Sequence, residues 1–251
     1  MAPEGESGRF GDIRRVDETG STNADVVALA RAGAPEGIVV VADFQRDGRG
    51  RRGRTWTAPP GSSLLASVLW RPPLAPSVVP LVGLAAAAAA VEACAGVAGV
   101  APSLKWPNDV VESAAGTAKL AGVLAESLTD GDGLAVVVGM GCNLTTAPAG
   151  ATCLEDLAGR PVDRDELLDA WLARLDRWCS ILESAEGPRA VVQAYRGRCI
   201  TLGRRVRVEM ADKPLEGRAV DVTQQGHLVV ETAVGRREVA AGEVIHLRPP
   251  P

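Results

Sequence analysis

Residues 104–144 decide the fold, and they read LKWPNDVVESAAGTAKLAGVLAESLTDGDGLAVVVGMGCNL. The segment holds four apolar stretches of strand length, at 104–106, 109–112, 120–128 and 134–144. Turn-forming residues separate the longer stretches: Ala-Ala-Gly at 114–116 and Asp-Gly-Asp-Gly at 130–133. Because strands joined by short turns pair antiparallel, the segment predicts an antiparallel meander.

The flanking sequence adds strands and helices to this meander. Upstream we expect a strand at 12–17, a helix at 24–32 that follows the N-cap residue types Ser21, Thr22 and Asn23 and stops at Gly33, strands at 38–44 and 62–70, and an alanine-rich helix at 78–97. Downstream we expect helices at 163–183 and 188–198; the first repeats apolar residues every three or four positions, so its tryptophans belong in the core. The fold class is therefore α+β, with a mixed, largely antiparallel central sheet flanked by helices.

The sequence pattern changes near residues 200–203, from helical stretches to short strand-like ones. Short strand-like stretches then follow at close spacing, at 205–209, 216–222, 227–231, 236–239 and 244–247. Such spacing is typical of a small β-barrel. We expect three parts: a disordered tail at 1–10, a main domain at 11–202 and a barrel at 203–248. The barrel is expected to be an appendage, whose removal after about residue 203 leaves the first chemical step partly intact and impairs the second.

Composition excludes several classes of protein. The chain has 251 residues, a formal net charge of −4, 46% hydrophobic and 23% charged residues, which is typical of a globular protein and not of a disordered or strongly basic one. The most apolar run, residues 81–91, is too short to span a bilayer, and no secretory signal precedes it. The five cysteines lack metal-binding spacing. We expect a reduced, cytoplasmic protein without membrane attachment.

A glycine-arginine segment is the first candidate for chemistry. Residues 46–54 read RDGRGRRGR, five arginines with three glycines between them. Glycines let the backbone fold tightly around a ligand, and guanidinium groups bind phosphate or carboxylate in pairs of hydrogen bonds. The segment therefore favours a small anion such as a nucleotide or acyl phosphate. A merely solvated loop and an RNA contact stay open, although Trp56 is the only aromatic residue just downstream.

Lysine is rare in this chain, which draws attention to the lysines inside motifs. Only three of the 27 basic residues are lysines, Lys105, Lys119 and Lys213. Lys105 opens the KWPND motif, in which Asn108 is suited to a phosphate or ribose and Asp109 to Mg²⁺. Lys119 precedes a strand and offers a compact cation for a phosphoryl group. Lys213 lies in an expected turn.

Two glycines in one apolar strand indicate close approach of another group. Gly139 and Gly141 fall within the sequence GMGCN, which ends at Asn143. The pattern lacks the remainder of a dinucleotide-binding fingerprint.

Together these motifs, in this order, resemble the catalytic core of the biotin protein ligases. The resemblance runs from about residue 17 to Asn143 and includes an SH3-like C-terminal barrel. It implies the core shared with class II aminoacyl-tRNA synthetases and a two-step reaction. Biotin and ATP first give biotinyl-5′-AMP, with Mg²⁺ as cofactor, and a lysine of the biotin carboxyl carrier domain of a carboxylase then accepts the biotin.

The resemblance also implies residue roles. The catalytic residues are Lys119, Arg51 and Asp109, and Asp109 is also the metal ligand. The biotin-binding residues are Ser21, Thr22, Asn23, Gln45, Arg49, Gly50, Arg51, Lys119, Gly122 and Gly139. The residues for ATP or the adenylate are Arg49, Arg51, Trp56, Lys105, Asn108, Lys119 and Asn143.

One departure from the bifunctional members of that family is visible. Only about 16 residues precede the first matching segment, too few for a helix-turn-helix. We therefore expect a monofunctional ligase that does not bind DNA or repress transcription, as a monomer or weak homodimer. A lipoate or octanoate transferase and a nucleic-acid-binding module remain the alternatives.

Overall fold

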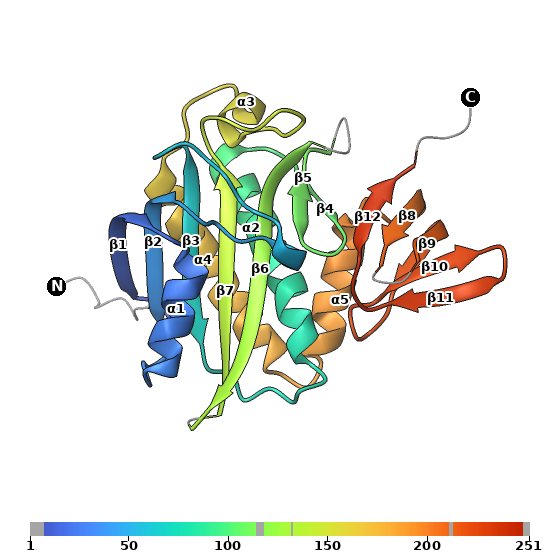
Figure 1. The fold of residues 1–251 in the computed structure, drawn as a ribbon, viewed down its shortest axis with the longest axis horizontal. Coiled ribbons are helices and arrows are strands. Elements are labelled where there is room, and N and C mark those ends of the chain that lie inside the picture. Colours follow the sequence, from blue (N-terminus) through green and yellow to red (C-terminus); the bar gives the residue numbers. More distant parts are fainter. Residues whose placement is uncertain (1–7, 114–117, 132, 211–212, 248–251) are drawn as a thin grey trace.

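The computed structural model describes residues 8–113, 118–131, 133–210 and 213–247, which form two sheets and their flanking helices (Figure 1). The larger sheet has seven strands in the order β1-β2-β3-β7-β6-β5-β4. Their bounds are β1 Asp12–Thr19, β2 Ile38–Gln45, β3 Ser63–Trp70, β4 Ser103–Lys105, β5 Asp109–Val111, β6 Lys119–Asp130 and β7 Gly133–Asn143. The predicted meander is confirmed, because β4, β5, β6 and β7 pair in sequence and antiparallel.

Only the β1–β2 pair of this sheet is parallel, and the helix α1 (Thr22–Arg31) connects its strands. The mixed, largely antiparallel sheet is therefore as predicted. The turn expected at 114–116 lies outside the described residues, as does Asp132 of the turn at 130–133.

Helices cover both faces of the large sheet because its central strands are apolar on both sides. In β2, Ile38 and Val40 pack with α1, whereas Val39 and Val41 face the opposite side. That side is covered by α2 (Val82–Ala98), α4 (Arg164–Leu182) and α5 (Gly187–Arg198) (Figure 1). The short α3 (Leu154–Ala158) follows β7.

The alanine-rich helix predicted at 78–97 is confirmed to within one residue, and it extends beyond the apolar run at 81–91. The 3₁₀ turn η2 (Val79–Leu81) leads directly into α2, which gives 20 helical residues at 79–98, enough by length and composition to cross a membrane. Its alanines at 85–90 are nearly all inaccessible to solvent, and the helix packs against α4. Small side chains let two helices approach closely, so this helix is the centre of the core.

The N-terminal ends of α4 and α1 differ in whether a side chain caps the helix. Asp163 caps α4, since its side chain accepts hydrogen bonds from the backbone of the first turn, and Trp171 and Trp178 are buried as expected. The start of α1 is different: the helix begins at Thr22, and the Ser21 side chain makes no capping bond. The polar residues of that turn are buried instead, which frees them for a different role.

The smaller sheet is antiparallel, in the order β11-β10-β9-β8-β12. Its strands are β8 Arg205–Glu209, β9 Leu215–Val222, β10 Leu228–Thr232, β11 Gly235–Val239 and β12 Glu243–His246. It is not a loosely attached appendage. Trp106 Nε1 donates to the carbonyl of Gly226 at 3.0 Å, and the apolar residues of this sheet continue the main hydrophobic core.

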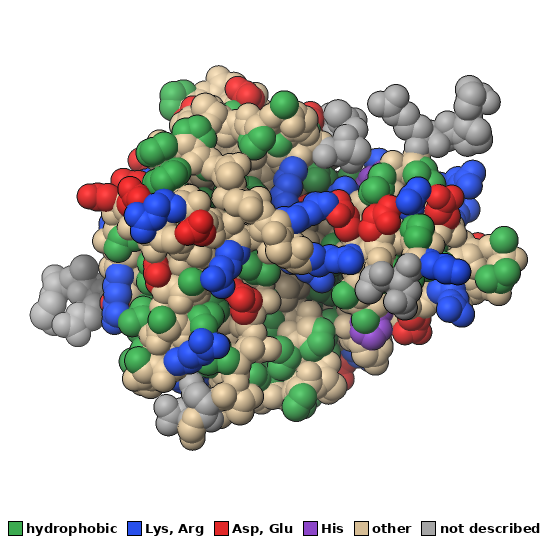
Figure 2. Space-filling view, in the orientation of Figure 1, with side chains coloured by type: hydrophobic (Ala, Val, Ile, Leu, Met, Phe, Trp, Pro, Cys, Tyr) green, Lys and Arg blue, Asp and Glu red, His purple; other side chains and the backbone are tan. Residues whose placement is uncertain are grey.

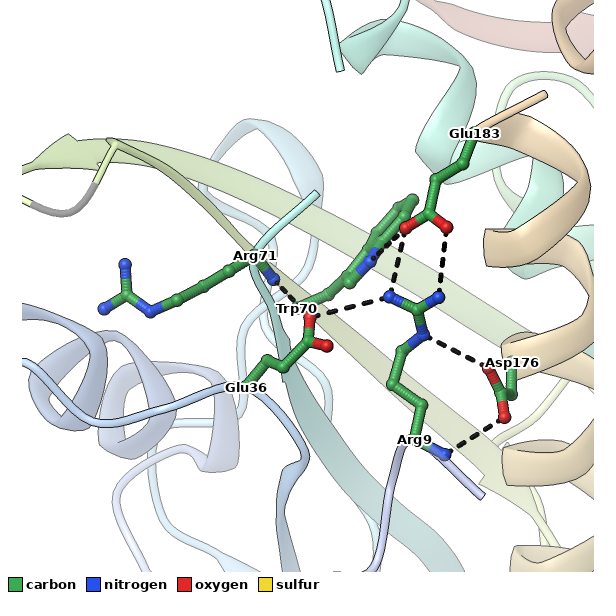
Figure 3. A network of polar contacts seen from close by, with 6 residues as sticks. All are labelled: Arg9, Glu36, Trp70, Arg71, Asp176 and Glu183. Atoms are coloured by element: carbon green, nitrogen blue, oxygen red, sulfur yellow. Dashed lines mark hydrogen bonds and ion pairs between the residues drawn. The ribbon is translucent and has the colours of Figure 1, made fainter. Parts of the chain in front are cut away.

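The tail predicted for residues 1–10 is too long. Residues 1–7 lie outside the described part, but Phe10 is buried and Arg9 is fixed to α4 and the residue after it (Figure 3). The Arg9 guanidinium donates to Asp176 and forms two hydrogen bonds with Glu183, all near 3 Å. Glu183 also accepts from Trp70 Nε1, so Arg9 is linked to both a helix and the sheet.

Candidate functional site

A cavity of about 410 Å³ lies where the large sheet meets the C-terminal sheet. Every residue predicted for the site lines it: Ser21, Thr22, Asn23, Gln45, Arg49, Gly50, Arg51, Trp56, Lys105, Asn108, Asp109, Lys119, Gly122, Gly139 and Asn143. Lysine and arginine side chains gather along the boundary between the two sheets (Figure 2). Residues far apart in sequence thus share one space, with one uncharged end and one cationic end.

The uncharged end is lined by Gln45, Thr22, Ser67 and Asn23, and their side chains form a continuous set of hydrogen bonds that ends at Glu126, outside the lining. We name these five residues the polar relay. Gln45 Oε1 accepts from Thr22 N at 2.8 Å, and the Thr22 and Ser67 hydroxyls lie 2.7 Å apart. Ser67 Oγ donates to Asn23 Oδ1 at 2.6 Å, and Asn23 Nδ2 donates to Glu126 Oε2 at 2.8 Å. Thr22, Asn23 and Ser67 are buried, whereas Gln45 and Glu126 are half-buried. Buried polar groups with satisfied hydrogen bonds form a rigid, oriented surface.

Glycines make room for this end and for its neighbour. A Cβ on Gly139 would lie 1.9 Å from Asn23 Oδ1, and a Cβ on Gly141 would lie 2.7 Å from the Trp56 indole. The prediction that another group approaches the backbone closely at both glycines is confirmed.

The cationic end centres on Lys119. Its Nζ lies 2.7 Å from Asp109 Oδ1 and 5.4 Å from the centre of the Trp56 ring. Lys105 and Arg51 lie on the same cavity, and burial is the main cause that lowers the pKa of each. A lowered pKa in a cation means that its charge lacks full solvation, so an anion entering this end would be stabilised.

The five arginines of the 46–54 segment divide into two groups. Arg46 pairs with Glu18, Arg52 donates to the carbonyl of Glu209, and Arg54 pairs with Glu243. Within the described part of the chain, Arg49 and Arg51 have no such partner, and both face the cavity. The segment crosses the large sheet toward the C-terminal sheet (Figure 1) and includes the 3₁₀ turn η1 (Arg51–Gly53).

Two side chains predicted to contact the nucleotide, Asn108 and Asn143, form hydrogen bonds with the backbone of the protein. Asn108 Nδ2 donates to the carbonyl of Val123 at 2.8 Å, and Asn143 Nδ2 donates to the carbonyl of Thr152 at 3.0 Å. Both amides therefore brace the strands that carry the site, and their oxygens are the atoms left for a ligand. Trp56 Nε1 is buried without a partner and is a donor available to a bound group.

Several lining residues were missed by the sequence analysis. Ser67 carries a partial signal, because Ser63 and Ser67 are the two polar residues of an otherwise apolar strand. Gly242, Glu243 and Val244 come from the C-terminal sheet and line the same cavity. No local pattern indicates that these distant residues reach the site.

The donor set does not form a ready-made magnesium site. The described residues hold no group of three or more His, Cys, Asp and Glu side chains suited to a metal. The two carboxylates on the cavity, Asp109 and Glu243, are each paired with a cation. Asp109 would have to leave Lys119 to take Mg²⁺, which in proteins is commonly held by one or two carboxylates together with substrate phosphates.

Comparisons with known proteins agree with this site. The sequence model of the biotin/lipoate A/B protein ligase family matches residues 15–143, and that of the biotin protein ligase C-terminal domain, the SH3-like part, matches 201–247. The chain is 37% identical over 243 residues to the biotin–acetyl-CoA-carboxylase ligase of Mycobacterium tuberculosis, covering 93% of this chain and 88% of that one. The corresponding ligase of Paracoccus denitrificans is 33% identical, with 90% and 97% covered.

Solved structures share the same architecture. The biotin protein ligase from Aquifex aeolicus, in complex with biotin and ATP, superposes with a TM-score of 0.80 at 27% identity, covering 96% of this chain and all of that one. Both sheets, the cavity between them and the long sequence matches lead to one conclusion: this chain belongs to the biotin protein ligases.

Proposed function

We propose that this chain activates biotin with ATP to biotinyl-5′-AMP and transfers the biotin to a lysine of a carboxylase carrier domain. One observation carries the proposal. A single cavity joins an uncharged, hydrogen-bonding end to an end with Lys119, Lys105 and Arg51. Biotin has the matching shape, because its ureido ring is uncharged and its valerate chain ends in a carboxylate.

In the first step, the polar relay holds the ureido ring and directs the carboxylate toward Lys119. A carboxylate oxygen attacks the α-phosphorus of ATP, the bond to the bridging oxygen breaks, and pyrophosphate leaves with the electron pair. Lys119 stabilises the charge that accumulates on the α-phosphoryl oxygens, and Arg49 and Arg51 bind the phosphates. A preorganised cation of this kind lowers the barrier without further reorganisation.

In the second step, the amine of the carrier lysine attacks the acyl carbon of the mixed anhydride. The bond to the phosphate oxygen breaks, AMP leaves with the electron pair, and the amine loses a proton. Trp56 covers the adenine side in this proposal, and Lys105, Asn108 and Asn143 border the nucleotide. Asp109 would be the protein ligand of a Mg²⁺ ion, which would neutralise part of the charge on the phosphates.

The proposed organisation keeps a main domain at 11–202 and a smaller one at 203–248, acting as a monomer or weak homodimer. The partner is the carrier domain of an acyl-CoA carboxylase, in the cytoplasm. DNA binding is not expected of this acidic chain, and a mobility-shift assay tests that expectation.

The test of the function is biotin-dependent exchange of labelled pyrophosphate into ATP, followed by transfer of labelled biotin to a purified carrier domain. We expect that exchange needs biotin but not the carrier domain, and that labelled biotin is transferred only when the carrier domain is added. Exchange that depends on lipoate or octanoate, with none on biotin, would contradict the proposal and favour the alternative transferase.

A further inference from the structure

The tip of the glycine-arginine segment at 46–54 has an unusual backbone. Arg52 has φ 56° and ψ 38°, and Gly53 after it has φ 73°, so both lie in the left-handed region. In the described part of the chain, Arg52 is the one residue other than glycine with a positive φ. Arginine is disfavoured there because its Cβ approaches a backbone oxygen, and tight hairpin turns that need a positive φ usually carry asparagine or glycine. Such an outlier persists where other contacts hold it in place.

Two contacts with the C-terminal sheet hold this tip. Arg52 Nη1 donates to the carbonyl of Glu209 at 2.6 Å, and Arg54 pairs with the Glu243 carboxylate. Glu209 and Glu243 are opposite each other on the paired strands β8 and β12, so both contacts fall at one place on this sheet. The segment behind the tip is a short hairpin closed by its own backbone, because Gly50 N donates to the carbonyl of Arg54 at 2.7 Å. A fixed tip therefore fixes the whole hairpin.

The two contacts are not equivalent. The Arg54–Glu243 pair joins two flexible side chains that are 60% and 35% accessible, and exposed pairs of this kind hold their partners weakly. The acceptor for Arg52 is instead a backbone carbonyl of the sheet, which has one fixed position. With both contacts in place the tip cannot turn about either of them.

The position of the tip decides where the cavity cations lie. Arg51 directly precedes Arg52 in the turn, is half-buried and lines the cavity. Burial is the main cause that lowers its pKa, and the nearby Tyr195 and Asp109 oppose that effect. Arg49 lies on the first strand of the same hairpin, opposite Thr55, and also lines the cavity. Both cations therefore move with the tip.

We propose that Arg52 is a positioning residue: its bond to the Glu209 carbonyl anchors the hairpin to the C-terminal sheet and holds Arg49 and Arg51 where a bound phosphate needs them. The inference rests on the proposed function, in which these two arginines bind the phosphates of ATP, and deepens it by giving the C-terminal sheet a part in the first step. Without the anchor the hairpin keeps its backbone bonds but loses its fixed position, so binding of ATP must first order it.

Two substitutions separate the anchor from the strained backbone. Arg52→Ala removes the guanidinium and leaves a residue that disfavours the left-handed region, whereas Arg52→Asn removes it and tolerates that region. Both should raise the KM for ATP in biotin-dependent pyrophosphate exchange about 3- to 10-fold, the effect of losing one hydrogen bond to a charged group at an exposed position. If Arg52 served only as a turn residue, Arg52→Asn would leave this KM unchanged.

A rescue variant and a matched control complete the test. Arg52→Lys keeps a cationic donor long enough to reach the carbonyl, so its KM for ATP should stay within about twofold of the wild type. Arg237→Asn replaces an exposed arginine of β11 that is not among the residues lining the cavity, and it should leave the KM unchanged. Without ligands, a non-specific protease should cut within 46–54 faster in Arg52→Asn than in the wild type or Arg52→Lys, because the tip is released.

The outcomes distinguish this inference from the function beneath it. A wild-type enzyme without biotin-dependent exchange overturns both. If the wild type exchanges normally, an unchanged KM for ATP in Arg52→Asn overturns only the role of Arg52. A KM that rises in Arg52→Ala but not in Arg52→Asn also overturns it, because backbone strain is then the cause.

The remaining outcomes test the anchor itself. A KM for ATP that stays raised in Arg52→Lys, or equal cleavage of Arg52→Asn and the wild type, contradicts an anchor made by a donor at this position. Unfolding of Arg52→Asn in a melting curve contradicts it as well, because an exposed residue whose task is positioning can be replaced without loss of the fold.

Discussion

Replacing Lys119 with arginine tests the centre of the proposed mechanism, because it keeps the charge and changes only its shape. The Lys119 ammonium is confined on three sides. Asp109 lies 2.7 Å away, the Trp56 ring centre lies at 5.4 Å, and a Cβ on Gly122 would come within 3.1 Å of Nζ. A guanidinium is broader and planar, so it cannot occupy this position without displacing the indole or the carboxylate.

The expected loss is catalytic, and stability should change little. Removing one preorganised contact to a transition state costs about 2.7–4 kcal/mol, or roughly 10²–10³ in rate. The ground-state pair with Asp109 is partly exposed, with 37% and 23% of the two side chains accessible, so it contributes at most about 1 kcal/mol to folding. Lys119→Arg should therefore melt near the wild type and fail in the first step.

The assay is biotin-dependent pyrophosphate exchange, with a melting curve for each variant. Lys213→Arg is the control, because Lys213 is exposed and is not among the residues that line the cavity. If folded Lys119→Arg keeps near-normal exchange, Lys119 is not the cation that stabilises the transition state.

Three further predictions use other parts of the structure. Gly141→Ala places a methyl group 2.7 Å from the Trp56 indole and should raise the KM for ATP roughly 5- to 100-fold in the exchange assay; an unchanged KM would separate Trp56 from the nucleotide. Limited proteolysis within 46–54 should slow when biotin and ATP are both present, whereas equal cleavage would argue against ordering by the adenylate. Burial and the nearby Lys105 and Arg204 lower the pKa of His246 to about 4. In the unfolded protein this histidine takes up a proton below about pH 6.5, whereas in the folded protein it does so only near pH 4, so the free energy of unfolding decreases between these two pH values. His246→Asn should therefore flatten the plot of melting temperature against pH in this range.

The elements of the large sheet were predictable because their signals are local. Alternating and continuous apolar runs, with turn residues between them, define β4 to β7 without any tertiary information. The parallel pairing of β1 with β2 was not specified by such patterns. It depends on how α1 packs across the sheet, which a sequence window of ten residues does not record.

The site was predictable to the extent that its residues are chemically unusual in this chain. Lys119 was singled out because lysine is rare here, and the glycines because strands seldom contain them. Glu126 carried no comparable signal, since a charged residue in an alternating strand is typical of a solvent-facing position. Its hydrogen bond with Asn23 joins two residues more than a hundred positions apart, and such distances leave no trace in local composition.

The C-terminal sheet changes the meaning of the arginine segment. From the sequence alone, five like charges on three glycines predict a loop that stays mobile until an anion neutralises it. In the structure, Arg52 and Arg54 are already held by Glu209 and Glu243 of the C-terminal sheet, and the charge left for a ligand is that of the two remaining cavity arginines. Removing the chain after residue 203 would release this loop, open the cavity wall and expose the apolar core beneath Trp106. The first step should therefore fail along with the second, whereas the sequence alone predicts that adenylate formation stays partly intact without the barrel.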